Sequence, residues 1–444
     1  MMESLYLCDA QGLAPLWLHG SGAQPPLVGA VRAAPRRLDA ETVEETLTIA
    51  LEGSGITPWL EALEARLADG RDGITPSYLT LQTAPGAPFW RSPLRGGDLT
   101  LLEGDAASRG VRLTLRRPPW WEGSLQALPL SNPNGSRLTT GLTLSNHQDN
   151  HAGHVNYASL AAADLPGSLP APFQAVLRAT GAGESLQTVL LGLGSDLEDA
   201  DGALWHALEG EDAQPGADAT LNVITAGPAS GGAFARLTWS APVWAHLATW
   251  TVPATDLGYL RGRRVHPVLC LNTPPAQAGL TLAWRVTAAP GATPLAQSAP
   301  FPAQVGHGLQ VGAALHLPPL ALGGGPYPAL YLELWAESTP AAPFTLDVDA
   351  VHLLPAEGWL HAYPLGGTPA GWDLVLDGLE ELVYSREPAT GARALTHVLG
   401  GEWPRLRPPH AHRLYLLWET QDGAAPAAQI TLRLFLRPRS EGVG

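Results

Sequence analysis

Apolar and polar residues alternate over short stretches along most of the chain, which is the pattern of half-buried β-strands. Residues 41–51 and 109–116 show it most clearly, with aliphatic side chains on one face and threonine, glutamate or arginine on the other. Residues 57–70 follow a helical period instead, with a proline suited to the first turn and Gly70 suited to the end. We therefore predict that residues 1–145 form a small β-barrel or sandwich with one α-helix packed on it.

Residues 146–355 contain a longer series of short apolar runs separated by turns rich in Gly and Pro. The predicted strands are 173–179, 186–193, 220–225, 234–239, 244–252, 265–271, 280–286, 311–317, 329–335 and 344–354. Short strands at fairly regular spacing are typical of an all-β sandwich. This second unit is therefore predicted to be a jelly-roll β-sandwich.

Residues 356–444 are predicted to form a third, smaller β domain. Two pairs of apolar runs in it are each separated by a segment that contains Asp-Gly, which is a strong hairpin signal. The predicted hairpins are 374–376 with 382–384 across Asp377-Gly378, and 414–418 with 429–436 across Asp422-Gly423. The whole chain is thus expected to be mainly β.

Residues 118–134 are predicted to be a linker or arm between the first two units. Trp120 and Trp121 follow two prolines, a poor arrangement for the interior of a strand. Two interpretations remain open for them. They pack as a loop across the first unit, or they contact a neighbouring subunit, because tryptophan is enriched at interface anchors.

Composition narrows the class of protein. The chain has 444 residues with 49 Gly and 42 Pro, a density that interrupts helices and argues against a helix-dominated fold. It contains no lysine, which excludes Schiff-base and phosphate-loop chemistry that depends on lysine. The formal charge of −15 is opposite in sign to that of a generic nucleic-acid or anionic-membrane binder. Most of this acidity lies in residues 146–355, which carry 6 arginines and 16 acidic residues.

The two cysteines, Cys8 and Cys270, lie far apart in sequence, which excludes a disulfide scaffold and a cysteine-based zinc module. The first residues lack a basic region followed by a long apolar stretch, and no run of about 18 apolar residues occurs. We therefore expect synthesis in the cytoplasm without a secretion signal, and no membrane-spanning helix.

Three histidines fall within eight residues, at His147, His151 and His154. Imidazoles at such spacing can bind a divalent transition metal. On a strand, however, His147 and His151 share a face and His154 points the other way unless the chain bends. The alternative is a polar loop or strand edge whose side chains bond the backbone.

Four carboxylates cluster at Asp196, Glu198, Asp199 and Asp201. The cluster resembles a calcium loop, but the spacing departs from the helix–loop–helix pattern because Leu197 occupies the first ligand position. Both a calcium site of another kind and a solvated acidic turn remain open.

Common catalytic motifs are absent from the sequence: there is no Gly-x-Ser-x-Gly, no His-Glu-x-x-His, no phosphate loop and no dinucleotide fingerprint. The chain has 15 tryptophans, and aromatic side chains on a sandwich face can stack on sugars. Trp239, Trp244, Trp250 and Trp284 lie within apolar strand patterns, which favours core packing. We assign no catalytic, cofactor-binding or metal-binding residue and expect that the protein is not an enzyme.

Three stretches resemble structural proteins of bacteriophage tails. Residues 142–172 combine a strand, a His/Asn/Asp segment and the sequence Gly-x-Leu-Pro-Ala-Pro, similar to the lead-in to a tail-protein jelly roll. Residues 346–355 are similar to the closing strand of carbohydrate-module-like jelly rolls. Residues 400–408 resemble a C-terminal hairpin of tail proteins, although Pro409 stands where glycine is expected. In outline the first unit is similar to the barrel-plus-helix of distal tail and tube proteins.

The resemblance implies a virion structural protein, made in the host cytoplasm, that forms a homo-oligomeric ring or tube through its first unit with the jelly roll facing outward. Its implied partners are copies of itself and other tail proteins, with no sequence-specific nucleic acid and no cofactor. Host surface glycans are a further potential partner. The alternative functions are a glycan-binding, host-recognition protein and, third, a carbohydrate-active enzyme, which needs two carboxylates in one cleft.

Overall fold

The computed structural model describes residues 4–9, 15–20, 26–72, 76–84, 87–105, 107–132, 137–145, 156–181, 183–194, 207–226, 229–240, 243–253, 262, 264–317, 329–339, 344–355, 359–364, 367–394, 397–420 and 429–441. Within these residues the strands pair antiparallel into six sheets, and α1 (Ile56–Asp72) is the longest helix. The predicted mainly β fold class is confirmed. No helix in these ranges is long and apolar enough to cross a membrane.

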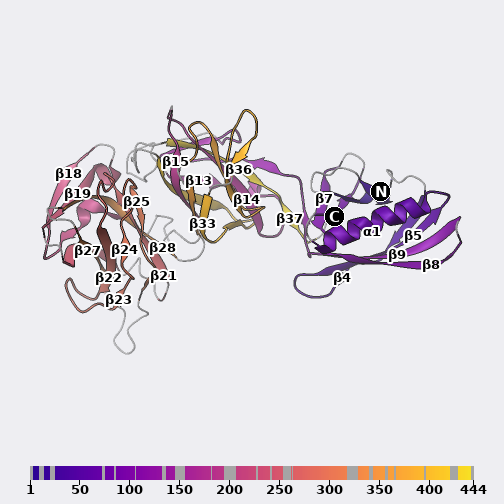
Figure 1. Ribbon diagram of the computed structural model, residues 1–444, viewed down its shortest axis with the longest axis horizontal. Coiled ribbons are helices and arrows are strands. Elements are labelled where there is room, and N and C mark those ends of the chain that lie inside the picture. Colours follow the sequence, from indigo (N-terminus) through magenta and orange to yellow (C-terminus); the bar gives the residue numbers. More distant parts are fainter. Residues whose placement is uncertain are drawn as a thin grey trace.

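The first domain packs two sheets and α1 around one core (Figure 1). Its strands are β1 (Ser4–Cys8), β2 (Leu16–His19), β3 (Leu27–Arg32), β4 (Arg36–Arg37), β5 (Val43–Glu52), β6 (Tyr78–Gln82), β7 (Phe89–Pro93), β8 (Gly97–Gly104), β9 (Ser108–Arg117), β10 (Trp121–Glu122) and β37 (Arg439–Ser440). The β6 sheet has the order β2-β1-β6-β7-β10-β37, and the β9 sheet has the order β3-β5-β9-β8 with β4 beside β5. The alternation in residues 41–51 and 109–116 and the helical period in 57–70 predicted β5, β9 and α1 correctly.

The second domain, the middle sandwich, is built from two distant parts of the chain. Its elements are β11 (Gln126–Leu128), β12 (Leu142–Ser145), β13 (Tyr157–Leu160), η1 (Ala162–Asp164), β14 (Ala171–Ala179), β15 (Leu186–Leu193), β29 (Trp359–Pro364), β30 (Asp373–Asp377), β31 (Leu382–Arg386), β32 (Arg393–Ala394), β33 (His397–Gly401), β34 (Arg405–Leu406), β35 (His412–Thr420) and β36 (Gln429–Leu436). The β14 sheet has the order β11-β36-β14-β30-β31-β32, with β12 beside β36 and β34 beside β14. The β15 sheet has the order β13-β35-β15-β29-β33.

The third domain, the inserted sandwich, lies in the chain between β15 and β29. Its elements are β16 (Ala207–Glu209), η2 (Gly210–Asp212), β17 (Gln214–Pro215), β18 (Thr220–Thr225), η3 (Ser230–Gly232), β19 (Ala233–Trp239), β20 (Ala245–Pro253), β21 (Arg264–Leu271), β22 (Leu280–Thr287), β23 (Ala296–Gln297), β24 (Phe301–Pro302), β25 (Leu309–Val311), β26 (Leu315–His316), β27 (Ala329–Ser338) and β28 (Phe344–Pro355). The β21 sheet has the order β18-β19-β28-β21-β25, with β16 beside β28 and β26 beside β21. The β27 sheet has the order β17-β20-β27-β22-β23, with β24 beside β22.

The two sandwiches stack face to face, so four sheets lie in series. One apolar core joins the β14 and β15 sheets, and another joins the β21 and β27 sheets. A third apolar cluster lies between the β15 and β21 sheets and includes Leu190, Tyr415 and Leu417 on one side with Val268 and Leu354 on the other. Both faces of the β15 and β21 sheets are therefore buried. Figure 1 shows the three domains in a row, with both chain termini in the first domain.

The sheet pairings divide the chain differently from the predicted ranges 146–355 and 356–444. The strands β14 and β36 pair along their length, although they come from opposite sides of the predicted boundary. The predicted hairpin of residues 414–418 with 429–436 is wrong, because β35 and β36 belong to opposite sheets of the middle sandwich. The other predicted hairpin, β30 with β31, is confirmed. The single strand predicted at 311–317 is instead two short strands, β25 and β26.

Candidate functional site at the junction of the two sandwiches

The junction contains a polar row on the face of the β15 sheet that meets the inserted sandwich. Glu419, Thr188 and Tyr363 lie on the adjacent strands β35, β15 and β29, with Glu419 directly opposite Thr188. Alternate residues of a strand share one face. Glu419 therefore continues the face on which Tyr415 and Leu417 contact the inserted sandwich.

The inserted sandwich presents His307 to this row from the turn that precedes β25. The turn needs a glycine at Gly306, whose φ is 77°, in the left-handed region. The buried side chain of Gln310 holds the turn in place: its Oε1 accepts from the Gln304 amide at 2.7 Å. Its Nε2 donates to the carbonyl oxygens of Gln304 at 2.9 Å and of His307 at 2.5 Å. The imidazole position is thus fixed by the turn and its brace.

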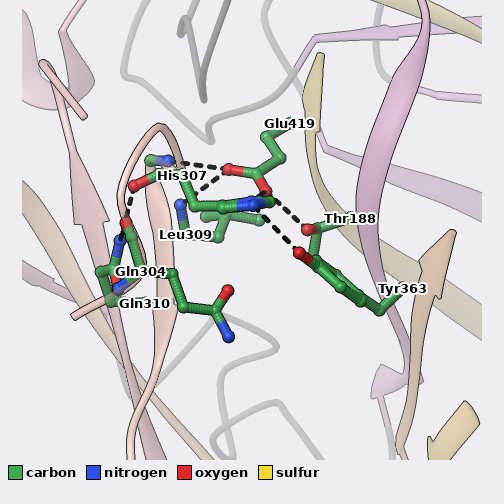
Figure 2. Close-up of polar contacts among 8 residues, drawn as sticks. Thr188, Gln304, His307, Leu309, Gln310, Tyr363 and Glu419 are labelled. Carbon is green, nitrogen blue, oxygen red and sulfur yellow. Dashed lines mark hydrogen bonds and ion pairs between the residues drawn. The ribbon is translucent and has the colours of Figure 1, made fainter. Parts of the chain in front are cut away.

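Glu419 has a fully buried side chain and accepts hydrogen bonds from both sandwiches (Figure 2). Its Oε1 accepts from the Thr188 hydroxyl at 2.5 Å and from Nδ1 of His307. Its Oε2 accepts from the backbone amides of Gly308 at 2.7 Å and Leu309 at 3.1 Å. A buried carboxylate is tolerated when its oxygens are satisfied in this way.

The carboxylate sets the protonation of the ring beside it. Its hydrogen bond raises the pKa of His307 above the ordinary value, against the opposing effect of partial burial. The Tyr363 oxygen lies 3.0 Å from Nε2 of His307. Burial, followed by the Glu419 charge, raises the pKa of Tyr363 and keeps its phenol protonated. A protonated imidazole donates from Nδ1 to Glu419 and from Nε2 to the phenol oxygen.

The order phenol, imidazole, carboxylate has the connectivity of a proton relay. The direction of the pKa shifts opposes such chemistry, because the Tyr363 phenol is harder to ionise and a protonated His307 cannot accept its proton. The geometry supports a structural role, in which the two sandwiches are held together: one buried anion of the middle sandwich binds three donors of the inserted sandwich. We call Glu419, His307, Thr188 and Tyr363 the junction clamp.

Rings continue the junction along β29. Trp359, His361 and Tyr363 are alternate residues on one face, and the Trp359 ring centroid lies 5.9 Å from that of His361 and 5.6 Å from that of His266. Burial lowers the pKa of His361 to about 4, so this ring is neutral at pH 7. A cavity of about 20 Å³ lies beside Trp359, which is room for roughly one water molecule and not for an organic ligand.

A second group of acidic side chains lies within the inserted sandwich. Asp349 Oδ1 accepts from the Ser230 amide at 2.9 Å, and the Ser230 hydroxyl donates to Glu209 at 3.0 Å. Burial raises the pKa of Asp349 to about 8, and the charges of Glu209 and Glu211 add to the effect. Asp349 is 1% exposed, so the carboxyl is closed to a substrate. No group of His, Cys, Asp and Glu among the described residues is arranged to hold a metal ion.

The two clusters weighed from the sequence lie outside the described residues. They are the histidines His147, His151 and His154 and the acidic residues 196–201. The metal and calcium interpretations therefore stay untested. Trp121, by contrast, is 2% exposed in the core of the first domain with Arg117 over its ring at 4.3 Å, which confirms intramolecular packing for this residue. The predicted loop is wrong at this position, because Trp121 lies on β10, which pairs with β7 and β37.

The aromatic side chains of the inserted sandwich divide into buried and half-buried ones. Trp239, Trp250 and Trp284 are buried in its core, as predicted, and Trp244 is half-buried. Trp335 lies half-buried on the outer face of the β27 sheet, and no sequence pattern marks it.

Neighbouring strands on either side of β27 cover the Trp335 ring. His246, on β20, stacks on it with centroids 5.0 Å apart, and the Arg285 guanidinium, on β22, lies 3.7 Å from its centroid. Because these two strands flank β27, they cover both faces of the indole. The Nε1 on the ring edge donates to Oε2 of Glu333 at 3.0 Å. The ring offers no open face on which a sugar would stack.

Sequence reasoning missed the junction clamp. Glu419 ends an apolar run and reads as the exposed end of a strand, and His307 reads as a turn residue. One signal was available: Leu414 to Trp418 is a continuous apolar run, which is typical of a strand buried on both faces. That signal predicts a second layer over the β15 sheet, and hence a buried position for Glu419.

Comparisons with known proteins add little. No protein-family model and no curated protein matches the chain. A solved structure described as the phage P2 baseplate in its activated conformation with Ca aligns with 45% of this chain and 74% of its own, at 10% identity and a TM-score of 0.25. The crystal structure of SPP1 Dit, described as a hub adsorption apparatus protein of phages that infect Gram-positive hosts, aligns with 99% of both chains, at 7% identity and a TM-score of 0.28. Both TM-scores are too low for the likeness to bear on the function of this chain.

Proposed function

We propose that the chain is a structural component of a bacteriophage tail, which assembles into a ring or tube through its first domain while the two sandwiches extend outward. The sequence resemblance to tail proteins supports the assignment to a bacteriophage tail. The observation that supports assembly through the first domain is that both edges of the β9 sheet are open. Among the described residues no strand pairs with the outer side of β3 or of β8.

These edges expose apolar side chains. Val28 and Val31 of β3 are 60% and 73% exposed, and Leu101 of β8 is 49% exposed. An open edge strand is a template for pairing with another chain, and soluble proteins usually protect it with charge or a covering segment. Apolar side chains on both edges therefore support contact with further copies.

The two edges lie on opposite sides of one sheet, so contact between them is heterologous. Each copy uses its β3 edge against one neighbour and its β8 edge against the other. Such head-to-tail contacts give a closed ring when the rotation between copies closes, and a filament when it does not. Figure 1 shows that a narrow connection joins the first domain to the stack of sandwiches.

Sedimentation velocity on the full chain tests this proposal. Wild-type protein is expected to sediment as an oligomer, and Val31→Asp is expected to shift it toward monomer because a charge enters the apolar contact. Val223→Asp is the matched control, since Val223 is 53% exposed on β18, an edge strand of the inserted sandwich. A wild-type monomer at high concentration, or dissociation by the control alone, would contradict assembly through the first domain.

Glycan binding by the inserted sandwich is the second candidate and has weaker support. Among its described residues, Trp239, Trp250 and Trp284 are buried, Trp244 is half-buried, and the ring of Trp335 is covered on both faces. The enzyme alternative requires two carboxylates reachable in one cleft, whereas the acidic group around Asp349 is closed to solvent at that residue.

A further inference from the structure

We infer that the outer face of the β14 sheet carries a binding site for a phosphate group. Three arginines from three strands, Arg178 on β14, Arg386 on β31 and Arg433 on β36, converge on the carboxylate of Asp373 on β30. Arg178 donates to Oδ1 from Nε at 2.8 Å and Nη2 at 2.6 Å. Arg386 and Arg433 each donate to Oδ2 from Nη2, at 3.1 and 3.0 Å. We call these four residues the arginine cluster.

The cluster is built around a buried anion. The Asp373 side chain is 1% exposed, whereas Arg178, Arg386 and Arg433 are 41%, 27% and 32% exposed. Guanidinium groups this close repel one another, and the aspartate offsets that repulsion and fixes their positions. Three positive charges face one negative charge, so the cluster keeps a surplus of two positive charges in a chain whose total is −15.

Most donors of the cluster are unused. A guanidinium has five N–H groups, about fifteen for the three arginines, and the four hydrogen bonds to Asp373 are the ones that these arginines make within the described part of the chain. The side chains beneath are packed, with Val176 and Val375 1% and 0% exposed. The arginines therefore present a flat, supported array of donors rather than long side chains free in water.

Phosphate fits this array better than carboxylate does. A phosphate monoester carries about −1.5 to −2 charges at pH 7, close to the surplus of the cluster, and has three acceptor oxygens. A carboxylate neutralises only half of the surplus. The planar guanidinium fork also matches phosphate geometry. The wider face continues the positive row, because Arg393 is registered with Arg386 on the next strand, although Glu380 lies 3.5 Å from it.

The inserted sandwich contains a contrasting pair that serves as a control. Arg236 donates from Nε and Nη2 to the two oxygens of Asp347, both at 2.8 Å, and its side chain is 43% exposed. One cation there meets one anion, so no surplus remains. The two sites share residue types, strand location and exposure, and they differ in the number of arginines that contact each aspartate.

Isothermal titration of the full chain tests the site, with inorganic phosphate and polyphosphate as probes and polyglutamate as the carboxylate probe. We expect a phosphate probe to bind, to weaken as salt rises, and to lose about tenfold in affinity in Arg178→Gln and in Arg433→Gln. Arg236→Gln is expected to bind as wild type does. Binding of inorganic phosphate would identify a site for a single phosphate group. Binding of polyphosphate alone would identify a site for a polymer that carries several phosphates.

Three results would overturn the inference: no binding of either phosphate probe, equal weakening by Arg236→Gln, or polyglutamate binding as tight as polyphosphate binding. The last result would instead identify a site for an acidic protein surface. Thermal unfolding of each variant shows whether it folds, and Arg386→Gln replaces either cluster variant that does not. If the cluster only stabilises the pairing of strands, these variants would have lower melting temperatures, and the wild-type protein would bind no phosphate.

Discussion

The chain has two interdomain junctions of opposite design. The middle and inserted sandwiches meet through whole sheet faces, with an apolar cluster and the junction clamp buried between them. The first domain and the middle sandwich meet through a ribbon of two strands: residues 121–128 pair with residues 434–440, first in the β6 sheet and then in the β14 sheet.

Few side chains hold the ribbon junction. Arg439 donates to Glu122 at 2.9 and 2.6 Å and lies over the Trp120 ring at 4.8 Å. The carbonyl oxygen of Arg439 accepts from the amides of Ser168 and Leu169, at 2.8 and 3.1 Å. One residue near the end of the chain thus links the first domain to the middle sandwich.

The difference indicates which parts move together. Bistable or movable elements are drawn from regions with few buried apolar contacts. We therefore expect the two sandwiches to behave as one body, and the first domain to change its orientation relative to them about the ribbon.

Removal of the clamp carboxylate should have the largest effect. Glu419→Ala leaves a histidine and two backbone amides without their buried acceptor, and the free energy of unfolding should fall by about 3–5 kcal/mol. Urea denaturation followed by tryptophan fluorescence measures it. Glu64→Ala, at an exposed glutamate on α1, should change it by less than about 0.5 kcal/mol. Equal effects of the two variants would show that the clamp contributes nothing.

Loss of the ribbon contact should destabilise the protein less than loss of the clamp carboxylate, and it should also change the orientation of the first domain. Arg439→Ala removes a partly buried, charge-assisted pair, with an expected cost of about 1–3 kcal/mol. Small-angle X-ray scattering should show a wider distribution of overall dimensions, because the first domain is released from one orientation. Arg405→Ala, at an exposed arginine of the middle sandwich, should leave the scattering curve unchanged. An unchanged curve for Arg439→Ala as well would mean that strand pairing alone fixes the orientation.

The smallest effect should be a pH dependence of the face-to-face junction. The pKa of His307 is raised in the folded state by Glu419, so the stabilisation is fully present below the unfolded pKa of about 6.5 and is lost as pH rises through the folded pKa. His307→Gln should therefore destabilise most below about pH 6 and least in alkaline solution. Thermal unfolding of wild type and variant across pH gives the difference.

His361 acts in the opposite direction and must be separated from His307. Its folded pKa is lowered to about 4, so its contribution is present above about pH 6.5 and is lost as pH falls toward 4. This contribution of His361 is the same in the wild type and in His307→Gln, so it cancels when the stability of one is subtracted from that of the other. A difference that is flat with pH would contradict a charged His307 in the clamp.

Local structure followed from the sequence, and long-range pairing did not. Period-two alternation predicted β5 and β9, short apolar runs between turns predicted most strands of the inserted sandwich, and Asp377-Gly378 predicted the β30–β31 hairpin. Alternation says which face of a strand is buried but not which strand lies beside it. The pairing of β14 with β36 joins residues more than two hundred positions apart, so the insertion was invisible.

The candidate sites share this limit of sequence reasoning. Arg178, Arg386 and Arg433 each occupy the outward position of an alternating strand and read as ordinary solvent-facing residues. Only the register of four strands brings them to Asp373. The clamp likewise depends on a turn of one domain reaching a strand of another, which no local pattern encodes.

Electron microscopy of the assembled full chain tests the central claim, that copies join through the first domain while the stacked sandwiches project as one body. We expect closed rings or tubes with first domains touching along their sheet edges, and outward arms that each contain both sandwiches in one fixed arrangement. Particles joined through the inserted sandwich, or arms whose two sandwiches vary in relative orientation, would contradict it.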